Sequence, residues 1–269
     1  MSKPIVLLTD FGYRDPYVGV MKGVIKKINP EAEIIDLTHG VRRQDILEAA
    51  VILLVSAPYF GKGTIFVCVV DPGVGSERKA LLIKTRNYYL IGPDNGCLSL
   101  LAQRDGVEAV YDISNSRFRL PRVSGTFHGR DLFAPIAAWL SLGIEPGVLG
   151  TQLGRDEFIK IEIPEPSLKE NEIEGTIIYV DVFGNAMTNI HGTLLEEIGW
   201  KLGTKLRITN LPTNEDFTCQ YVKSFSHVKE GEPACYINSW GYLEIGVFMG
   251  DAATSFGLNP RTHIKISVY

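Results

Sequence analysis

The sequence has no long apolar run and no excess of basic residues, and each absence removes a class of protein. No run approaches the length of a membrane-spanning helix, and the start of the chain lacks the apolar core and small-residue cleavage site of a secretory signal. We therefore expect a cytoplasmic protein with no membrane partner. The 27 Lys and Arg residues are outnumbered by 31 Asp and Glu residues, giving a net charge of -4. This balance disfavours a nucleic-acid partner and favours a small-molecule ligand.

Cysteine is scarce and shows no paired spacing. The chain has four cysteines, Cys68, Cys97, Cys219 and Cys235, and none forms a CxxC motif. Cys68 lies within an apolar run, which is typical of a small buried hydrophobic residue. We expect all four cysteines to be reduced and structural.

The first 150 of the 269 residues alternate short apolar runs with helical patterns, which predicts an α/β domain with a central sheet flanked by helices. Expected strands are residues 5–9, 34–37, 64–70, 80–84, 88–91 and 109–113. Expected helices are residues 18–28, 46–54 and 130–142.

Composition changes near residue 165, where prolines and polar residues interrupt the apolar pattern. We place an N-terminal domain at residues 1–165, a linker at 166–174 and a C-terminal domain at 175–269. Beyond the linker the apolar runs are short, with glycine, asparagine and proline between them, which favours a smaller all-β barrel or sandwich. Its expected strands are residues 175–180, 205–208, 234–237, 242–247 and 264–268.

Asp10 directly follows the first predicted strand. Ligands bind at the carboxyl ends of strands in open α/β sheets, and an acidic group there commonly accepts hydrogen bonds from ribose hydroxyls. The alternative is that Asp10 closes a turn or caps the helix that begins near Pro16. Asp15, directly before Pro16, is the better candidate for that cap, which favours a ligand role for Asp10.

Two further segments carry charged side chains in glycine-containing turns. Asp71 follows the strand expected at residues 64–70, and Arg78 lies seven residues further along, where it can pair with Asp71 across a folded loop. A purely structural ion pair is a common alternative. His128 precedes the helix expected from residue 130, and a helix N-terminus favours a neutral imidazole. A single histidine is weak support for a site.

In the second half, residues 181–185 and 238–242 combine aromatic, amide, hydroxyl and carboxylate groups at bends. Phe183 could stack on a planar base while Asn185 reads its polar edge. The alternative for this segment is an ordinary hairpin with Phe183 in the core.

Six segments in chain order resemble the family of S-adenosylmethionine (SAM) hydrolases, also called SAM hydroxide adenosyltransferases, which are related to bacterial fluorinating and chlorinating enzymes. The segments are residues 8–12 (LTDFG), 71–75 (DPGVG), 92–96 (GPDNG), 127–131 (FHGRD), 181–185 (DVFGN), and 238–239 with 241–242 (NS and GY). The resemblance implies an α/β N-terminal domain, a C-terminal β-barrel and a homotrimer. It also implies that each site lies between the N-terminal domain of one subunit and the C-terminal domain of its neighbour.

The implied reaction converts SAM and water into adenosine and L-methionine, with SAM as substrate and with no cofactor or metal. By resemblance, Asp71, Arg78 and His128 are the catalytic residues. The same resemblance assigns the ribose hydroxyls to Asp10, adenine to Phe183, Asn185 and the backbone around Ala252, and the methionine ammonium and carboxylate to Asp181 and Ser239.

Three other readings compete with SAM hydrolysis. A halogenase of the same fold has a tyrosine, a threonine and a serine around the halide, whereas this chain has Asp71, Val74 and Gly129. A carboxylate beside the nucleophile would repel a halide, so water is favoured. A sensor would bind SAM or adenosine without turnover. A metal-dependent hydrolase would use Asp10, Asp71, Asp94, His39 and His128.

Overall fold

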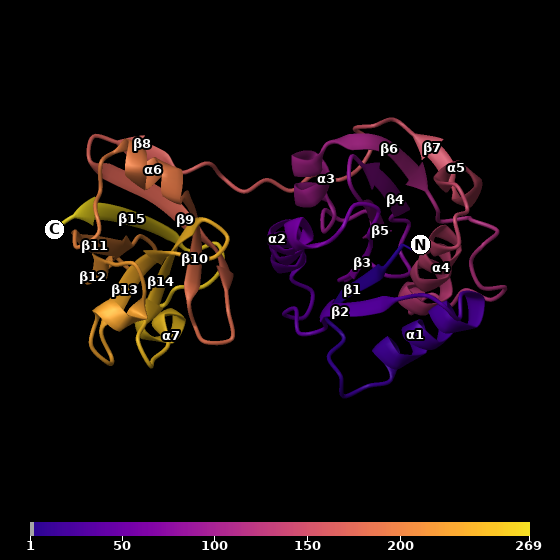
Figure 1. Cartoon of the computed structure of the whole chain (residues 1–269), viewed down its shortest axis with the longest axis horizontal. Coiled ribbons are helices and arrows are strands. Elements are labelled where there is room, and N and C mark those ends of the chain that lie inside the picture. The colour runs from indigo at the N-terminus through magenta and orange to yellow at the C-terminus, as the bar shows by residue number, and fades with distance from the viewer. Residues whose placement is uncertain (1–2) are drawn as a thin grey trace. The chain divides into compact units, whose positions relative to one another are not determined.

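The computed structural model describes residues 3–269 and contains two compact units (Figure 1). Unit 1 ends at Ile161 and unit 2 spans Glu162–Tyr269, close to the border expected at residue 165. Strand β8 and the first residues of β9 lie within the segment 166–174 expected as a linker, and Leu168 pairs with Ile173 there. None of the helices in the described residues has the length and apolar character needed to cross a membrane.

Unit 1 is built on a seven-stranded mixed sheet with the order β2-β1-β3-β5-β4-β6-β7. The first four strands in this order are parallel and the last three extend the sheet in antiparallel fashion. All six strands expected in this half are present. The strands are β1 (Ile5–Thr9), β2 (Ile34–Thr38), β3 (Ile65–Val69), β4 (Ala80–Thr85), β5 (Tyr89–Pro93), β6 (Val107–Asp112) and β7 (Thr151–Leu153).

Helices cover both faces of this sheet because successive side chains of each buried strand point to opposite sides. Ile5 and Leu7 of β1 pack into a core with α1 and α4, whereas Val6 and Leu8 pack into another core with α2 and α3. The helical segments are α1 (Tyr17–Ile28), α2 (Ile46–Ser56), η1 (Ala57–Tyr59), α3 (Ser99–Asp105), η2 (Gly129–Phe133), α4 (Ala134–Ser141) and α5 (Pro146–Leu149).

The helix expected over residues 130–142 is present in altered form. Its first turn, η2, is a π-helical turn, in which the amide of Ala134 donates to the carbonyl of Gly129. The regular α-helix α4 begins only at Ala134, with Pro135 in its first turn. Proline lacks the N–H that would donate an α-helical hydrogen bond at this position. The wider π-helical turn therefore loses no hydrogen bond there.

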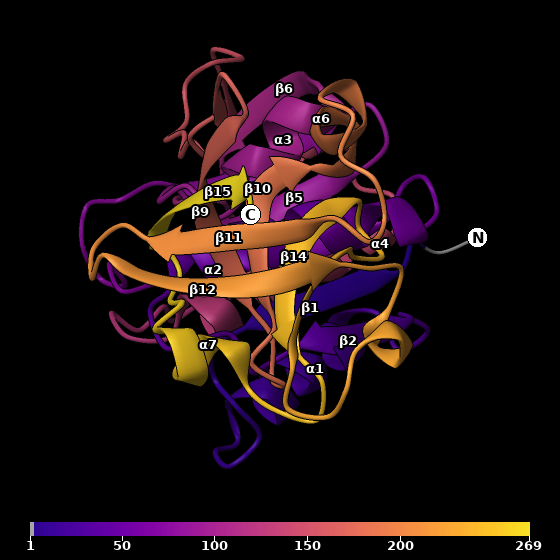
Figure 2. The same ribbon diagram turned by 90° about the vertical axis from the view of Figure 1, so that its left-hand side faces the viewer.

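Unit 2 is a β-barrel, as predicted. Seven strands follow one another in the order β10-β14-β13-β12-β11-β15-β9, and pairing of β9 with β10 closes the ring (Figure 2). β8 pairs antiparallel with the first residues of β9 and is not one of the seven strands of the ring. The strands are β8 (Ser167–Lys169), β9 (Glu172–Val180), β10 (Ala186–His191), β11 (Lys205–Asn210), β12 (Glu215–Tyr221), β13 (Pro233–Ile237), β14 (Tyr242–Val247) and β15 (His263–Val268). The helical segments are α6 (Gly192–Glu197), η3 (Phe225–His227) and α7 (Ala252–Phe256).

The prediction that all four cysteines are reduced is wrong. Cys219 of β12 and Cys235 of β13 form a disulfide, while Cys68 and Cys97 are free and buried. β12 and β13 pair in parallel through two residue pairs, Gln220 with Ala234 and Tyr221 with Cys235. This pairing brings the two cysteines to neighbouring strands, a proximity that their spacing in the sequence does not reveal. The disulfide therefore reinforces a seam of the barrel that has few ladder hydrogen bonds.

We predict that removing this disulfide destabilises unit 2. The bond joins residues 16 positions apart, and the loss of such a link costs about 3 kcal/mol in the chain-entropy treatment. Urea unfolding followed by hydrogen exchange at the β13 amides should show this loss in the Cys219→Ser/Cys235→Ser variant. Dithiothreitol should destabilise the parent protein and leave the variant unchanged. Equal midpoints for parent and variant without reductant would contradict the prediction.

Candidate active site

Asp10 and Asp71 emerge at the same edge of the unit 1 sheet. β1 and β3 are adjacent parallel strands, and Thr9 is the register partner of Val69. Asp10 follows Thr9 directly, and Asp71 comes two residues after Val69. Because parallel strands share their carboxyl ends, the sheet delivers both carboxylates to the edge where ligands bind in such folds.

Arg78 joins Asp71 to His128. The Arg78 Nε donates to Asp71 Oδ1 at 2.9 Å, and Arg78 Nη2 donates to Asp71 Oδ2. The same Nη2 lies 2.8 Å from His128 Nδ1. The side chains of Asp71 and Arg78 are 5% and 9% exposed. The structure thus brings together three side chains that were expected to act together, from segments about fifty residues apart in the sequence.

The bonding pattern defines the tautomer of His128. A guanidinium can only donate hydrogen bonds, so Nδ1 of His128 is the acceptor and a neutral ring carries its proton on Nε2. Burial lowers the pKa of His128 most, and the charge of Arg78 lowers it further, while Asp71 and Asp131 act in the opposite direction. His128 is therefore neutral at pH 7 and offers an N–H group from Nε2.

Two glycines allow the segments that carry these side chains to approach closely. A Cβ at Gly75, which has φ of +81°, would collide with the carbonyl oxygen of Gly125. A Cβ at Gly129 would lie 3.1 Å from Met21 Sδ and 3.2 Å from the Phe127 ring. Glycine at position 75 therefore lets the turn after β3 pack against the segment before η2, and glycine at position 129 lets the first turn of η2 pack closely on Met21 of α1.

The loop that follows β2 binds the carboxylate of Asp10. Asp10 Oδ2 accepts a hydrogen bond from the backbone amide of Gln44 at 2.9 Å, and Gln44 adopts a φ of 66°. The N-cap residue of α1 is Pro16, without a side-chain cap. Asp10 therefore does not cap α1, and the expectation that Asp15 does so is wrong, because the turn at Pro16 begins the helix without a side-chain acceptor.

In unit 2 most of the predicted binding residues line one hollow of about 450 Å³. They are Asp181, Phe183, Asn185 and Ser239. Phe183 is 72% exposed at this hollow, which contradicts the alternative that placed it in the core. Ala252 is buried at the start of α7 and does not line the hollow.

Asp181 organises the turn that carries the aromatic and amide groups. Its Oδ1 accepts hydrogen bonds from the amides of Phe183 and Asn185, both at 2.9 Å. Its Oδ2 accepts from the Asn185 side chain at 2.8 Å. These three bonds orient Phe183 and Asn185 on the hollow, so Asp181 is at least in part a positioning residue.

The sequence predictions missed Glu244, an acidic residue of the same hollow. Glu244 is 7% exposed and accepts hydrogen bonds from Tyr236 Oη at 2.6 Å and Asn238 Nδ2 at 2.8 Å. Burial raises the pKa of Glu244, Asp181 adds to this effect, and the two hydrogen bonds oppose it. Within residues 3–269 no basic side chain pairs with this carboxylate. The sequence did contain a signal for Glu244, because this glutamate lies between Leu243 and Ile245, which are both in the barrel core.

The side chains required by a metal-dependent hydrolase do not converge. Among the described residues, no group of three or more His, Cys, Asp or Glu side chains has the arrangement of a metal site. His39 instead contacts Thr9 and Asp36, and Asp94 accepts a hydrogen bond from the Ile159 amide at 2.7 Å.

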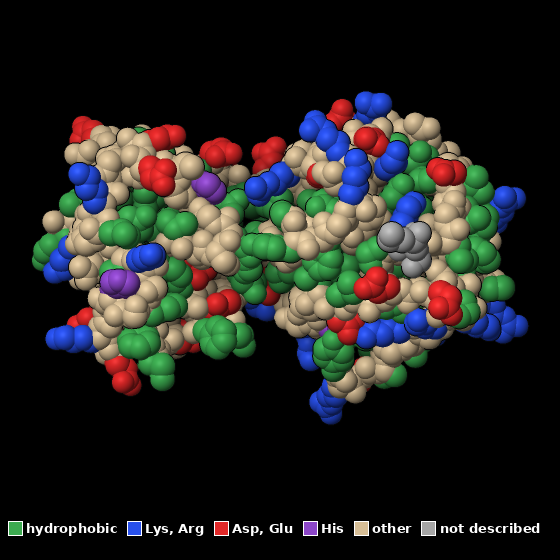
Figure 3. Space-filling view, in the orientation of Figure 1, with side chains coloured by type: hydrophobic (Ala, Val, Ile, Leu, Met, Phe, Trp, Pro, Cys, Tyr) green, Lys and Arg blue, Asp and Glu red, His purple; other side chains and the backbone are tan. Residues whose placement is uncertain are grey.

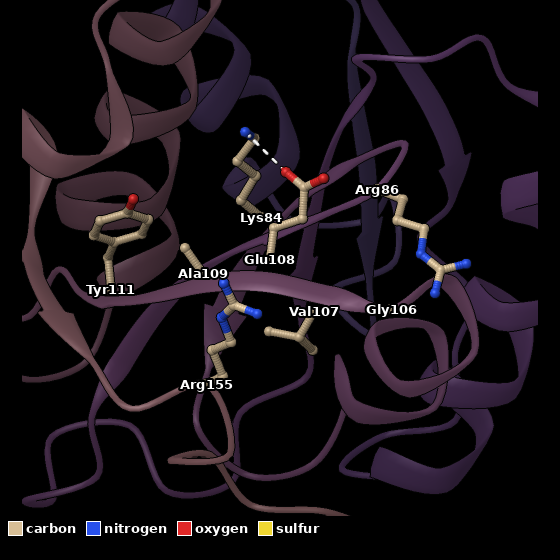
Figure 4. A pocket seen from close by; sticks show the side chains of 8 residues that line it. All are labelled: Lys84, Arg86, Gly106, Val107, Glu108, Ala109, Tyr111 and Arg155. Atoms are coloured by element: carbon tan, nitrogen blue, oxygen red, sulfur yellow. Dashed lines mark ion pairs between the residues drawn. The ribbon is translucent and has the colours of Figure 1, made fainter.

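A separate hollow lies over β4 and β6, and no predicted site residue lines it (Figure 4). Its main ion pair joins Lys84 to Glu108 at 2.9 Å, and Arg86 and Arg155 lie at its sides. Elsewhere on the visible surface, side chains of both charges are interspersed (Figure 3). This hollow resembles an ordinary charged surface and does not form part of the candidate site.

Comparisons with known proteins find relatives that span almost the whole chain. Residues 5–150 match the SAM hydroxide adenosyltransferase N-terminal domain, and residues 175–265 match the C-terminal domain of the same name. An (R)-S-adenosyl-L-methionine hydrolase of Methanocaldococcus jannaschii is 37% identical over 97% of this chain and 95% of its own length. A fluorinase of Nocardia brasiliensis is 27% identical over 99% of this chain and 97% of its own. The crystal structure of an uncharacterized conserved protein from Thermotoga maritima superposes with a TM-score of 0.92 at 36% identity, covering 98% of this chain and 99% of that one.

We predict that the two neighbours of His128 shift its pKa in opposite directions. Arg78→Gln should raise the pKa of His128, because it removes a repelling charge and leaves Asp71 in place. Asp71→Asn should lower this pKa below that of the parent, because it removes an attracting charge. NMR titration of the imidazole protons measures both, and His128→Gln identifies the signal among the five histidines. Shifts of the same sign in the two variants would show that Arg78 and Asp71 do not set the charge state of His128.

Proposed function

The chain belongs to the SAM hydroxide adenosyltransferase family, and we propose that it hydrolyses SAM to adenosine and L-methionine. The observation that carries this proposal is the cluster of His128 with the buried side chains of Asp71 and Arg78, at the sheet edge that also presents Asp10. The full-length similarity to an (R)-SAM hydrolase supports the same reaction.

The reaction requires water to attack C5′ of the ribose in line with the bond to the sulfonium sulfur. The leaving group is a neutral thioether, so the positive charge on sulfur disappears as the bond breaks. Water is a weak nucleophile, and holding it in line can recover about 7 kcal/mol or more of the barrier in favourable cases. The site must therefore orient one water molecule and accept its proton.

We assign the water to Asp71 and His128. Since Arg78 occupies Nδ1 of His128, the Nε2–H group of the neutral ring donates to the water oxygen. Each carboxylate oxygen of Asp71 keeps a lone pair beyond its bond to Arg78, so Asp71 is the group that accepts the proton of the water. Arg78 holds both side chains and stabilises negative charge on the hydroxide that forms.

The substrate contacts divide by chemistry between the two units. We propose that Asp10 accepts hydrogen bonds from the ribose hydroxyls. Phe183 stacks on adenine, and Asn185 reads its polar edge together with the backbone around Ala252.

We propose that Ser239 binds the methionine carboxylate, with Asp181 close to the methionine ammonium. Asp181 is already bound to its own turn, whereas Glu244 lines the same hollow with no basic partner among the described residues. We therefore propose that Glu244 shares the ammonium group with Asp181 and helps to balance its positive charge.

Water, and not a halide, is the nucleophile in this proposal. A carboxylate stands at position 71, where the related halogenating enzymes have a tyrosine, and it would repel fluoride or chloride. Gly129 stands where a halide site has a serine, and a Cβ at Gly129 would lie 3.1 Å from Met21 Sδ and 3.2 Å from the Phe127 ring. The chain therefore lacks the hydroxyl that a serine would offer to a halide at this position.

We predict that the purified protein releases adenosine and L-methionine from SAM in equal amounts, with EDTA present or absent. Asp71→Asn and His128→Ala should each lower kcat by about a hundredfold or more, because each removes an aligned proton-transfer or orienting group. Chromatography of the products measures the reaction, and adenosine binding by each variant serves as the control for folding. Turnover that needs added metal, a halogenated nucleoside product, or binding without turnover would each contradict the proposal.

We further propose that the chain forms a homotrimer in which one subunit supplies the residues of unit 1 and a neighbour supplies those of unit 2. Asp71→Asn and Phe183→Ala variants, each weakly active alone, should then complement each other after subunits are exchanged. In a closed ring with random mixing, about a quarter of the sites combine an unsubstituted unit 1 with an unsubstituted unit 2. Activity assays of the mixture and a mass measurement by light scattering test this. A mixture no more active than its components would place each site within one chain.

A further inference from the structure

We propose that His39 is a positioning residue for Asp10, and that it sets the affinity of the site for the ribose diol. The inference rests on the proposed function, because it concerns how the ribose is held. It begins from a buried histidine that the mechanism does not use. His39 directly follows β2, and 1% of its surface is exposed.

Both ring nitrogens of His39 have partners. Nδ1 lies 2.8 Å from Thr9 Oγ1, and Nε2 lies 3.0 Å from Asp36 Oδ1. Burial would raise the pKa of Asp36, but hydrogen bonds from Lys22, His39 and Tyr13 lower it overall, so this carboxylate accepts hydrogen bonds. His39 Nε2–H therefore donates to Asp36, and Nδ1 shares a hydrogen bond with the Thr9 hydroxyl.

This chain of bonds reaches the backbone on both sides of Asp10. Thr9 Oγ1 accepts a hydrogen bond from the Phe11 amide at 3.2 Å. The Gly12 amide donates to the His39 carbonyl at 2.8 Å. Tyr13 Oη donates to Asp36 Oδ2 at 3.0 Å, and its ring packs edge-on against the His39 ring. The residues that flank Asp10 are thus tied to His39 or to its partner Asp36.

Asp10 itself has a different anchor. Its carboxylate is bound by the Gln44 amide, while its backbone is held through Thr9 and the residues that follow it. A carboxylate recognises two neighbouring hydroxyls only when its plane has a fixed direction. The Gln44 bond orients the carboxylate, and the His39 bonds fix the backbone from which it extends before the ligand arrives, which saves the cost of ordering the loop on binding. Their loss should weaken the contact to the diol and leave contacts to the base intact.

The test compares adenosine with 2′,3′-dideoxyadenosine, which lacks both hydroxyls. Thr9→Val keeps the shape of the side chain and removes the hydroxyl that His39 and Phe11 share. Calorimetry should give adenosine binding weakened about tenfold, as expected for one lost buried hydrogen bond. Binding of the dideoxy analogue should stay within about twofold of the parent. In His39→Asn the new side-chain amide can still hydrogen-bond the Thr9 hydroxyl. This variant should therefore bind adenosine more weakly than the parent but more tightly than Thr9→Val.

Thr85→Val is the matched control. Thr85 ends β4 as Thr9 ends β1, is 2% exposed, and has a hydroxyl bonded to the carbonyl and amide of Tyr88, both at 3.1 Å. Its loss removes similar bonds from the same unit, so the ratio of the two affinities should remain that of the parent. A double-mutant cycle adds a second criterion, because Thr9→Val should have no further effect on adenosine binding when Asp10→Ala is already present.

Equal weakening of both ligands in Thr9→Val would show that His39 supports only the fold, and would overturn the inference. The same conclusion would follow if Thr9→Val weakened adenosine binding as much in the Asp10→Ala protein as in the parent. If the parent protein releases no adenosine from SAM, the proposed function is contradicted. The ratio of the adenosine and dideoxyadenosine affinities in Thr9→Val still decides whether His39 positions Asp10. A parent that binds both ligands equally would overturn the role of Asp10 and that of His39 together.

Discussion

The ion pair between Arg78 and Asp71 is the interaction on which the candidate site depends. Both side chains are almost fully buried, and Arg78 also donates to Nδ1 of His128. Removing one member of a buried pair typically costs about 3–5 kcal/mol, because the remaining charge is left without a partner. One guanidinium therefore orients a carboxylate, selects the tautomer of an imidazole, and joins the turn after β3 to the start of η2.

The backbone has to meet two conditions before that pair can form. Parallel pairing of β1 with β3 brings Asp10 and Asp71 to one edge of the sheet, and glycine at position 75 lets the turn after β3 come into contact with Gly125. The π-helical turn after His128 adds a third adjustment at the same place. Such turns are frequent at functional sites, since they redirect the side chains beside them. Gly75 and the π-helical turn thus both lie beside the proposed catalytic residues.

Much of the fold follows from periodicity, because the buried strands of unit 1 are continuous apolar runs and α1 repeats its apolar residues at helical spacing. β10 and β12 escaped prediction since polar residues such as Thr188 and Gln220 interrupt their apolar pattern. The Cys219–Cys235 bond depends on which strands become neighbours, which no local pattern encodes. Glu244 was missed for a related reason, because its burial and its place in the hollow depend on the barrel around it.

The carboxylates of Asp71 and Glu244 differ in a way that suits the charges of SAM. During attack at C5′ the sulfonium loses its positive charge, so an unpaired carboxylate beside it would stabilise the substrate more than the transition state and slow the reaction. Asp71, at the proposed reaction centre, has its charge balanced by Arg78. The ammonium group of the methionine keeps its charge throughout, and a carboxylate there stabilises both states equally. The proposed function accordingly places Glu244, which has no such partner among the described residues, at the end of the substrate whose charge does not change.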